Sequence, residues 1–267
     1  MKALFRGLLL VFCFLGTWLL LSQIDFVSFF KIDRAKSVAE KSVGDLIWNE
    51  LKKKEDVIVN DSITKTLDKL LKPLCEENDI ERDSLKVHVI KKNEINAFAL
   101  PDGHLVVYSG LIEASKNEQA LLGVLGHEIA HIEKRHVMKK LSKEIGFSVI
   151  MSLTTGNGNA TVIKEIMQTL SSSAYDRSLE READISSVEY MLKAKIDPAP
   201  FADFLYEMSF DGGELSNALS WVSTHPESEE RAKYILEYIK GQKVEKKTFL
   251  NQTEWKAFKE AVKEYEE

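Results

Sequence analysis

The chain has 267 residues, of which 44% are hydrophobic and 29% are charged, and its formal net charge at pH 7 is -6. This length is enough for one large domain or two small ones, and the composition is that of a globular protein. The negative net charge argues against general nucleic-acid binding, which requires a basic surface, so we expect no nucleic-acid partner. Of the two cysteines, Cys13 lies in an apolar leader, which leaves Cys75 without a partner for a structural disulfide.

Residues 1–30 form a segment that differs from the rest of the chain. Lys2 and Arg6 precede an apolar run, residues 7–22, that contains no charged side chain. As a helix this run covers about 24 Å, slightly less than the ~30 Å hydrocarbon core of a bilayer, and flanking residues such as Phe5 can complete a span. The alternative is a cleaved signal peptide, but no small-x-small cleavage site follows the run.

We favour an uncleaved, single-pass anchor in the inner membrane over a cleaved signal that releases the protein into the periplasm. Lys2 and Arg6 favour a cytoplasmic N-terminus by the positive-inside rule, although Lys31, Arg34 and Lys36 on the other side weaken this assignment. We therefore expect the remainder of the chain in the periplasm or an equivalent extracytoplasmic compartment.

Two amphipathic helices are predicted after the leader, over residues 34–53 and 62–78. Asp61-Ser62 provides an N-cap for the second helix. Both helices carry a row of aliphatic side chains on one side, so we expect them to pack over the core of the domain.

Residues 85–109 change to a period of two, which predicts β-strands. Strands are expected over residues 95–100 and 104–108, joined by a Pro-Asp-Gly turn that suits a hairpin. The two histidines of this region, His88 and His104, are expected to be surface residues of the strands. Alternation of this kind indicates a sheet with one buried face.

A His-Glu-x-x-His motif lies within the amphipathic run from residue 117 to residue 140. His127 and His131 are four residues apart and share one face of a helix, so both imidazoles can reach a single zinc ion at about 2.0–2.1 Å. Glu128 occupies the position of the carboxylate that takes a proton from water at the metal. The alternative is a core helix with hydrogen-bonded histidines, but these three side chains are costly to bury without a function.

A catalytic zinc site has three protein ligands and one open position. The metzincin pattern would place glycine at position 134 and histidine at position 137, where this chain has Lys134 and Val137. We therefore predict a distant carboxylate, Glu180, as the third ligand. Asp184 lies four residues later on the same helical face and is expected to accept the free N–H of a ligand histidine. His136 is expected to be a structural residue beside the motif.

The rest of the chain is predicted to be helical. Residues 142–173 form a helical hairpin around a loop at residues 154–159, and helices follow at residues 177–195 and 199–209. Near the end of the chain, Asn251 and Glu254 form a capping pair that predicts a final helix packed on the domain.

Four motifs in chain order carry a resemblance to a known family. They are residues 96–103 (NAFALPDG), residues 127–131 (HEIAH), residues 180–184 (EREAD), and residues 224–226 (THP) with Arg231 beyond. The chain resembles the zinc metallopeptidases that include the CAAX prenyl protease, the heat-shock membrane protease and the periplasmic β-barrel-assembly protease. The motifs span most of residues 60–240. Asp102 departs from the family, which usually has glycine there, and this difference concerns the turn rather than the chemistry.

The resemblance implies a fold of the α+β class: a mostly helical zincin-like metallopeptidase domain with a small β-sheet, here preceded by one N-terminal membrane helix. It also implies a gluzincin, with one Zn2+ per chain held by His127, His131 and Glu180. By the same resemblance, His225 reaches the active site as a catalytic residue. There it stabilises the oxyanion of the tetrahedral intermediate or occupies the open zinc position in the resting enzyme. The alternative is that it only precedes a helix that begins at Pro226.

These observations predict three parts of the chain. Residues 1–30 are the transmembrane anchor or signal sequence, residues 31–240 the zinc metallopeptidase domain, and residues 241–267 a C-terminal helical extension packed on the domain. Arg231 is expected to orient the His225 segment or to stabilise charge.

The predicted function is that of a membrane-anchored zinc metalloendopeptidase in envelope or membrane protein quality control. Its partners are polypeptide substrates, in particular misfolded envelope or membrane proteins, which lie as an added strand along an edge of the sheet. Glu128 is the general base that activates the attacking water. One alternative is a membrane-tethered chaperone or assembly factor with a latent zinc site. Another is a structural zinc module, which would normally have four protein ligands.

Overall fold

The computed structural model describes residues 32–154, 160–172, 174–209, 219–242 and 244–265. The chain divides into two compact units, residues 1–39 and residues 40–267, and the fold described below is that of the second unit. The segment for which we predict a membrane anchor, residues 1–30, lies outside the described residues. Among the described helices, none is both long enough and apolar enough to cross a bilayer.

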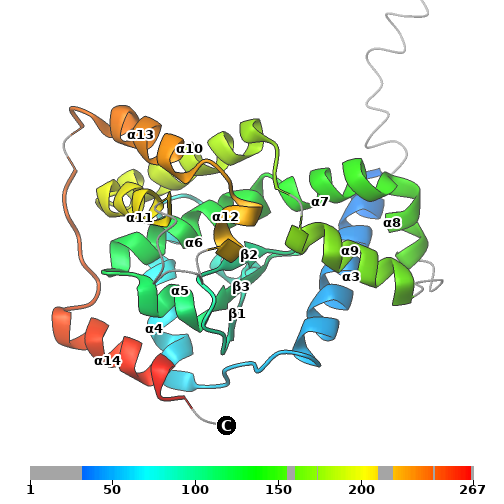
Figure 1. The fold of residues 1–267 in the computed structure, drawn as a ribbon, viewed down its shortest axis with the longest axis horizontal. Helices are drawn as coiled ribbons and strands as arrows, with labels where there is room; N and C mark the ends of the chain where they lie inside the picture. The colour runs from blue at the N-terminus through cyan, green and yellow to red at the C-terminus, as the bar shows by residue number, and fades with distance from the viewer. Residues whose placement is uncertain (1–31, 155–159, 173, 210–218, 243, 266–267) are drawn as a thin grey trace, which may run out of the picture. The chain divides into compact units, whose positions relative to one another are not determined.

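A small sheet of three strands lies among the helices, as Figure 1 shows. The strands β1 (Lys86–Ile90), β2 (Ala97–Ala99) and β3 (His104–Tyr108) are arranged in the order β1-β3-β2. β1 is parallel to β3, and β2 is antiparallel to it, so the predicted hairpin is confirmed. This order leaves β2 at the edge of the sheet.

The turn between β2 and β3 explains the departure from the family pattern at Asp102. Asp102 and Gly103 have φ angles of 62° and 76°, in the left-handed region. A Cβ atom on Gly103 would also lie 2.0 Å from the carbonyl oxygen of Ser84, so glycine is required there. Aspartate tolerates the left-handed conformation better than most residues, which allows it at position 102.

Helices account for most of the described residues, which confirms the predicted α+β class. They are α3 (Ile32–Lys52), α4 (Asp61–Glu76), α5 (Ser109–Ala114), α6 (Glu118–Glu133), α7 (His136–Leu141), α8 (Phe147–Thr154), α9 (Ala160–Ser172), α10 (Arg177–Lys193), α11 (Ala199–Ser209), α12 (Leu219–Thr224), α13 (Ser228–Ile239) and α14 (Gln252–Lys263), with a 3-10 helix at Arg82–Ser84 and a π-helix at Ser142–Gly146.

The two faces of the sheet contribute to two separate apolar clusters. Leu105 and Val107 of β3 join the larger cluster, which is built mainly from α4, α6, α10 and α11. Val106 and Tyr108, which alternate with them, join a second cluster with Ile47 of α3 and residues of α7, α8 and α9. Because side chains alternate along a strand, this short sheet forms the layer between the two groups of helices.

The close approach of α6 and α10 depends on a glycine next to the metal motif. A Cβ atom on Gly126 would lie 2.7 Å from the hydroxyl oxygen of Ser187. The same hydroxyl donates a hydrogen bond of 2.7 Å to the carbonyl of Gly123. These contacts bring the two helices together where α6 carries His127 and α10 carries Asp184, and they therefore set the spacing of the site.

Hydrogen bonds connect the C-terminal part of the chain to the start of α6. Glu118 is 4% exposed, and its two carboxylate oxygens accept hydrogen bonds from the backbone N–H groups of Phe249 and Leu250, at 2.6 and 2.8 Å. In α14 that follows, Asn251 and Glu254 form the predicted capping box. α14 packs beside α4 and α5 in Figure 1, and its apolar side chains join the larger cluster.

Some sequence expectations differ from the structure at the ends of helices. The N-cap of α4 is Asn60, whose side chain accepts from two backbone N–H groups of the first turn, rather than Asp61-Ser62. α6 ends at Glu133 instead of continuing to residue 140, because Arg135 adopts a left-handed conformation with φ of 55°. α13 begins at Ser228 and not at Pro226, after Glu227 with φ of 64°.

The expectation that His104 lies on the surface is wrong. Its exposed fraction is 2%, and His88 is half-buried. The two rings lie 5.1 Å apart, and Trp48 of α3 stacks on His88 with ring centroids 3.6 Å apart. α3 therefore covers the face of the sheet that the alternating pattern assigned to solvent.

Candidate metal centre

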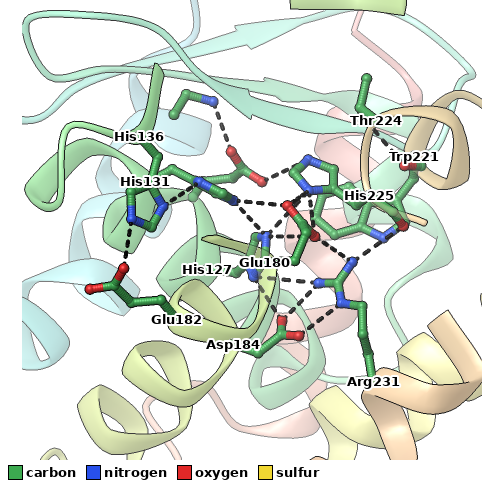
Figure 2. A network of polar contacts seen from close by, with 12 residues as sticks. His127, His131, His136, Glu180, Glu182, Asp184, Trp221, Thr224, His225 and Arg231 are labelled. Carbon is green, nitrogen blue, oxygen red and sulfur yellow. Dashed lines mark hydrogen bonds and ion pairs between the residues drawn. The ribbon is translucent and has the colours of Figure 1, made fainter. Parts of the chain in front are cut away.

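Four polar side chains from distant parts of the chain meet in the interior of the domain. His127 and His131 come from α6, Glu180 from the first turn of α10, and His225 from the residue after α12. The exposed fraction of each is 3% or less. One ligand atom from each of the four lies within 4.8 Å of all the others, and Figure 2 shows the side chains converging.

The distances show which atoms face one another. The Nε2 atoms of His127 and His131 are 3.0 Å apart. Glu180 places one carboxylate oxygen 3.4 Å from His131 Nε2 and the other 3.7 Å from His127 Nε2. His225 Nδ1 lies 3.0 Å from a Glu180 oxygen. Glu180 therefore points at both imidazoles, as the predicted ligand set requires.

Asp184 lies behind His127, in the position expected from the sequence. The Nδ1–H of His127 donates to Asp184 at 2.8 Å, which leaves Nε2 free to present a lone pair to the cluster. Arg231 donates two hydrogen bonds to the same carboxylate, at 2.8 and 2.7 Å, and the hydroxyl of Tyr234 donates a third. Asp184 is thus fully partnered although it is completely buried.

Arg231 connects α10 to the segment that carries His225. Its Nη1 atom is 2.9 Å from a carboxylate oxygen of Glu180 and donates to the backbone carbonyl of His225 at 3.2 Å. The guanidinium is 3% exposed. Of the two roles predicted for Arg231, these contacts favour orientation of the segment.

His131 has a second partner that the sequence reasoning did not identify. Its Nδ1 atom lies 3.0 Å from Nδ1 of His136, and His136 Nε2 lies 3.3 Å from a carboxylate oxygen of Glu182. With His131 Nε2 directed at the cluster, its Nδ1–H donates to His136, and His136 in turn donates to Glu182. The left-handed residue Arg135 breaks the helix and turns His136 back toward His131.

Tyr175 is another residue of the site that the sequence reasoning missed. Its ring stacks on His131, with centroids 4.2 Å apart, and is 8% exposed. It lies between α9 and α10, where no periodic pattern singles it out. His225 is held in a similar way, by stacking on Trp221 at 4.2 Å. Two aromatic rings therefore limit the orientations of two of the histidines.

Glu128 joins the cluster to the edge strand. Its Oε2 atom accepts a hydrogen bond of 2.8 Å from the backbone N–H of Ala99 in β2. Its Oε1 atom is buried and makes no hydrogen bond to the described residues, and it faces His225 Nε2 at 3.4 Å. A buried carboxylate oxygen without a donor is costly, so this atom is available for a group that the protein itself does not supply.

Burial and nearby charges set the protonation of these groups. Burial lowers the pKa of His131 and of His225 to about 4, so both rings are neutral at pH 7. Burial also raises the pKa of Glu128 well above its usual value, and the Glu180 carboxylate adds to this effect. Burial opposes ionisation of Glu180 as well, but His225 and the Arg231 guanidinium hold its pKa well below the usual value.

The donor set fits a zinc ion. Neutral imidazoles and an ionised carboxylate are the ligands that zinc takes in catalytic sites. Without a cation, the facing nitrogen atoms of His127 and His131 have no proton to share when each Nδ1 carries its hydrogen. The partners of the two Nδ1 atoms, Asp184 and His136, are of the kind that orient ligand histidines in zinc proteins.

Comparisons with known proteins agree with this geometry. The sequence model of peptidase family M48 matches residues 61–239 of this chain. The chain is 27% identical over 201 residues to the mitochondrial metalloendopeptidase OMA1 of Arabidopsis thaliana, covering 73% of this chain and 39% of that protein. It is 28% identical over 187 residues to the OMA1 of Schizosaccharomyces pombe, covering 69% and 56%.

A bacterial relative is more distant. The chain is 23% identical over 200 residues to the β-barrel assembly-enhancing protease of Yersinia pestis, covering 70% of this chain and 41% of that protein. The chain thus spans between about two fifths and just over half of the length of these three relatives. The matched region contains all four residues of the cluster.

Proposed function

Because this chain belongs to peptidase family M48, we propose that it is a zinc-dependent metalloendopeptidase that hydrolyses peptide bonds. His127, His131 and Glu180 are the proposed zinc ligands, and Glu128 is the proposed general base. The observation that carries this proposal is the convergence of Glu180 on both imidazoles, with its oxygen atoms 3.4 and 3.7 Å from their Nε2 atoms.

The side chains of this site can supply the proton transfers that hydrolysis needs. A bound zinc ion contributes Lewis acidity, which lowers the pKa of water toward about 7 and polarises a carbonyl group. Glu128 Oε1, which makes no hydrogen bond within the described part of the chain, accepts the proton of the attacking water and then delivers it to the leaving amine. The Ala99 N–H holds the other oxygen at 2.8 Å and so fixes the carboxylate.

The edge strand β2 provides a surface for an extended substrate. The bonds from Leu100 N–H to the His104 carbonyl and from Tyr108 N–H to the Asn96 carbonyl join β2 to β3. Backbone groups alternate in direction along a strand, so those of Ala97 and Ala99 point away from β3. The Ala99 N–H donates to Glu128, which leaves the Ala97 groups and the Ala99 carbonyl for a peptide. A peptide that pairs with this edge would be held extended beside Glu128.

His225 is a proposed catalytic residue with two possible positions. In the present arrangement its Nδ1 atom lies among the ligand atoms, 3.3 Å from His127 Nε2 and 3.0 Å from a Glu180 oxygen. This placement favours occupation of the fourth zinc position in a resting enzyme. Rotation of the ring out of that position would let it donate to the oxyanion during catalysis.

The wider biological role is also a proposal. We propose that residues 1–30 anchor the protein in the inner membrane as a single pass, because residues 7–22 are apolar and uncharged. Residues 31–240 would then be the extracytoplasmic peptidase domain and residues 241–267 its helical extension. Relatives named as a metalloendopeptidase and a β-barrel assembly-enhancing protease support polypeptide substrates. We further propose that these substrates are misfolded envelope or membrane proteins, within protein quality control.

Cleavage of an unfolded protein by the zinc-loaded full chain tests the proposal. Wild-type protein should cleave, and a chelator should stop the reaction. Glu128→Gln should keep the zinc and the melting temperature but lose about 10²–10⁴-fold in rate, because it removes the general base. Wild-type turnover in this variant would show that Glu128 is not the base.

Two other outcomes would favour other functions. Zinc-loaded protein that prevents aggregation of its targets without cleaving them would favour a chaperone or assembly factor with a latent site. Zinc that is bound by His127, His131, Glu180 and His225 at once, and that never exchanges His225 for water or substrate, would favour a structural site with four protein ligands. Glu128 Oε1, which lies beside the cluster and accepts no hydrogen bond from the described residues, argues against the structural site.

A further inference from the structure

A pocket with an apolar interior opens on the sheet face opposite α6. Its volume is about 480 Å³, within the range of about 300–1,000 Å³ that small-molecule sites occupy. Ile47 and Leu51 of α3 and Tyr108 of β3 line its interior and are buried. Met167 and Leu170 of α9 line it from the other side and are half-buried.

Two short stretches of chain connect the lining of the pocket to the proposed active site. Phe98 and Leu100 line it, and the residue between them, Ala99, donates its backbone N–H to Glu128. Thr224 also lines it, and the next residue, His225, lies among the proposed zinc ligands. A molecule held in the pocket therefore lies next to the groups that would carry out hydrolysis.

The geometry of a strand explains what would enter the pocket. Successive side chains of a strand point to opposite faces of a sheet. A substrate paired with the free edge of β2 continues the sheet by one strand, so every second side chain lies on the same face as Phe98 and Leu100. One of these side chains next to the scissile bond is then directed toward the pocket.

The chemistry of the lining indicates the kind of side chain. The aromatic ring of Phe98 contacts that of Tyr108 edge-on, with centroids 5.6 Å apart, and this pair forms one wall beside the aliphatic residues. Charged side chains also line the pocket: Lys54, Glu55, Lys92, Glu94 and Lys164. The ammonium group of Lys92 lies 3.1 Å from Glu94, 3.7 Å from Glu55 and 4.9 Å from the centroid of the Tyr108 ring, so the two carboxylates balance its charge beside the aromatic wall. An apolar side chain would gain from burial there, whereas a charged one would lose its water.

We propose that this pocket is a specificity subsite that takes a large apolar side chain, such as leucine, methionine or phenylalanine, of a peptide extended along β2. This inference rests on the proposed peptidase function and adds a substrate class to it. Burial of such a side chain predicts a preference of about tenfold or more over glycine or aspartate at one fixed position beside the scissile bond.

Mapping of cleavage sites provides the test. The zinc-loaded full chain digests an unfolded, carboxymethylated protein, and mass spectrometry gives the residue frequencies on both sides of each cleaved bond. Met167→Lys places an ammonium group in the pocket and should abolish the apolar preference. Met167→Ala enlarges the pocket and should shift the preference toward phenylalanine and tryptophan. Glu165→Gln makes the same change in charge at an exposed residue of α9 outside the lining and should keep the wild-type preference.

The outcomes separate this inference from the proposed function. Cleavage without an apolar preference, or a preference that survives both Met167 variants, would overturn the subsite and leave the peptidase function intact. If wild-type protein cleaves nothing, the function fails, and the subsite is then decided by fluorescence anisotropy with two labelled peptides that differ in one phenylalanine or aspartate. Tighter binding of the phenylalanine peptide that Met167→Lys abolishes supports the subsite, and equal binding overturns it.

Discussion

Two clusters of histidine and carboxylate groups in this protein are similar in composition but differ in where the nearest basic side chain lies. The proposed metal centre brings together His127, His131, Glu180 and His225, and a second cluster brings together Asp45, Asp102 and His104. In both, the candidate ligand atoms lie within 4.8 Å of one another. Composition and proximity therefore do not distinguish a metal site from an ordinary polar network.

The position of a basic side chain distinguishes them. In the second cluster, Lys86 Nζ pairs with Asp102 and lies 3.6 Å from Asp45 and 3.2 Å from His104 Nε2. Its ammonium group thus takes the place that a metal ion would need. In the metal centre, Arg231 contacts the outer side of Glu180 and Asp184 and leaves the inner side to the histidines. The comparison teaches that a metal site also requires the basic side chains of the protein to lie outside the space between the ligand atoms.

The largest expected effect is on zinc affinity. Glu180→Ala removes a direct ligand and should lower the affinity by more than the about 10–100-fold that loss of an outer partner causes. Asp45→Ala, the corresponding change in the second cluster, should leave zinc affinity unchanged. Titration of metal-free protein against a competing zinc dye measures both. Equal losses in the two variants would mean that the second cluster also contributes to zinc binding.

A second effect concerns stability without metal. Arg231→Met leaves Asp184 and Glu180 buried without their cation, and this should cost about 3–5 kcal/mol of unfolding free energy. Lys86→Met removes a cation that is 37% exposed and should cost about 0–1 kcal/mol. Urea unfolding in the presence of a chelator gives both values. If the two variants lose similar amounts of unfolding free energy, the difference in burial between Arg231 and Lys86 does not matter for stability.

A third effect tests the partner of His131. Leucine in His136→Leu cannot accept a hydrogen bond from the Nδ1–H of His131, so zinc affinity should fall by about 10–100-fold. His136→Gln offers an oxygen to His131 and an N–H to Glu182 and should recover most of that loss. The readout is again zinc affinity of the metal-free protein, with the melting temperature as a control for folding. If leucine and glutamine behave alike, His136 only fills space.

The smallest expected effect is a change in the acid dependence of stability. Burial lowers the pKa of His88 to about 3, and the neighbouring His104, Lys86 and Lys52 act in the same direction. The unfolded chain takes up this proton near pH 6.5 and the folded chain only near pH 3, so stability falls as the pH decreases between these values. His88→Phe keeps an aromatic ring against Trp48 but removes the titration.

Urea midpoints measured at pH 7 and pH 5 check this effect. The decrease between the two pH values should be smaller in His88→Phe than in the wild type. His104 carries a lowered pKa for the same main reason, burial, and remains in both proteins. An identical decrease would show that His88 takes up its proton as readily in the folded chain as in the unfolded one.

The spacing of a few residues was sufficient to predict most of the proposed site. His127 and His131 share a helical face by their separation alone, and the absence of a nearby third histidine directed attention to Glu180. Asp184 followed from the same spacing of four. The structure places these side chains together, as expected, because helical periodicity is a local property that can be read from the spacing.

Other features depend on contacts that no local pattern encodes. His136 reaches His131 only because Arg135 takes a left-handed conformation and ends α6 early. His104 alternates like a surface residue, yet α3 packs over that face of the sheet. Tyr175 lies in a connecting segment without periodicity. In each case the decisive information is a backbone turn or a neighbouring element that comes from elsewhere in the chain.

The carboxylate of Glu118 has a practical consequence for anyone who shortens or fuses this protein. A chain that ends before residue 249 would remove both N–H donors of Glu118 and leave this carboxylate without them at the first turn of α6, the helix of the HEIAH motif. Inactivity of such a truncated protein would report misfolding rather than a missing catalytic group. Purification tags and reporter fusions at the C-terminus are safer when they begin after α14 than when they replace it.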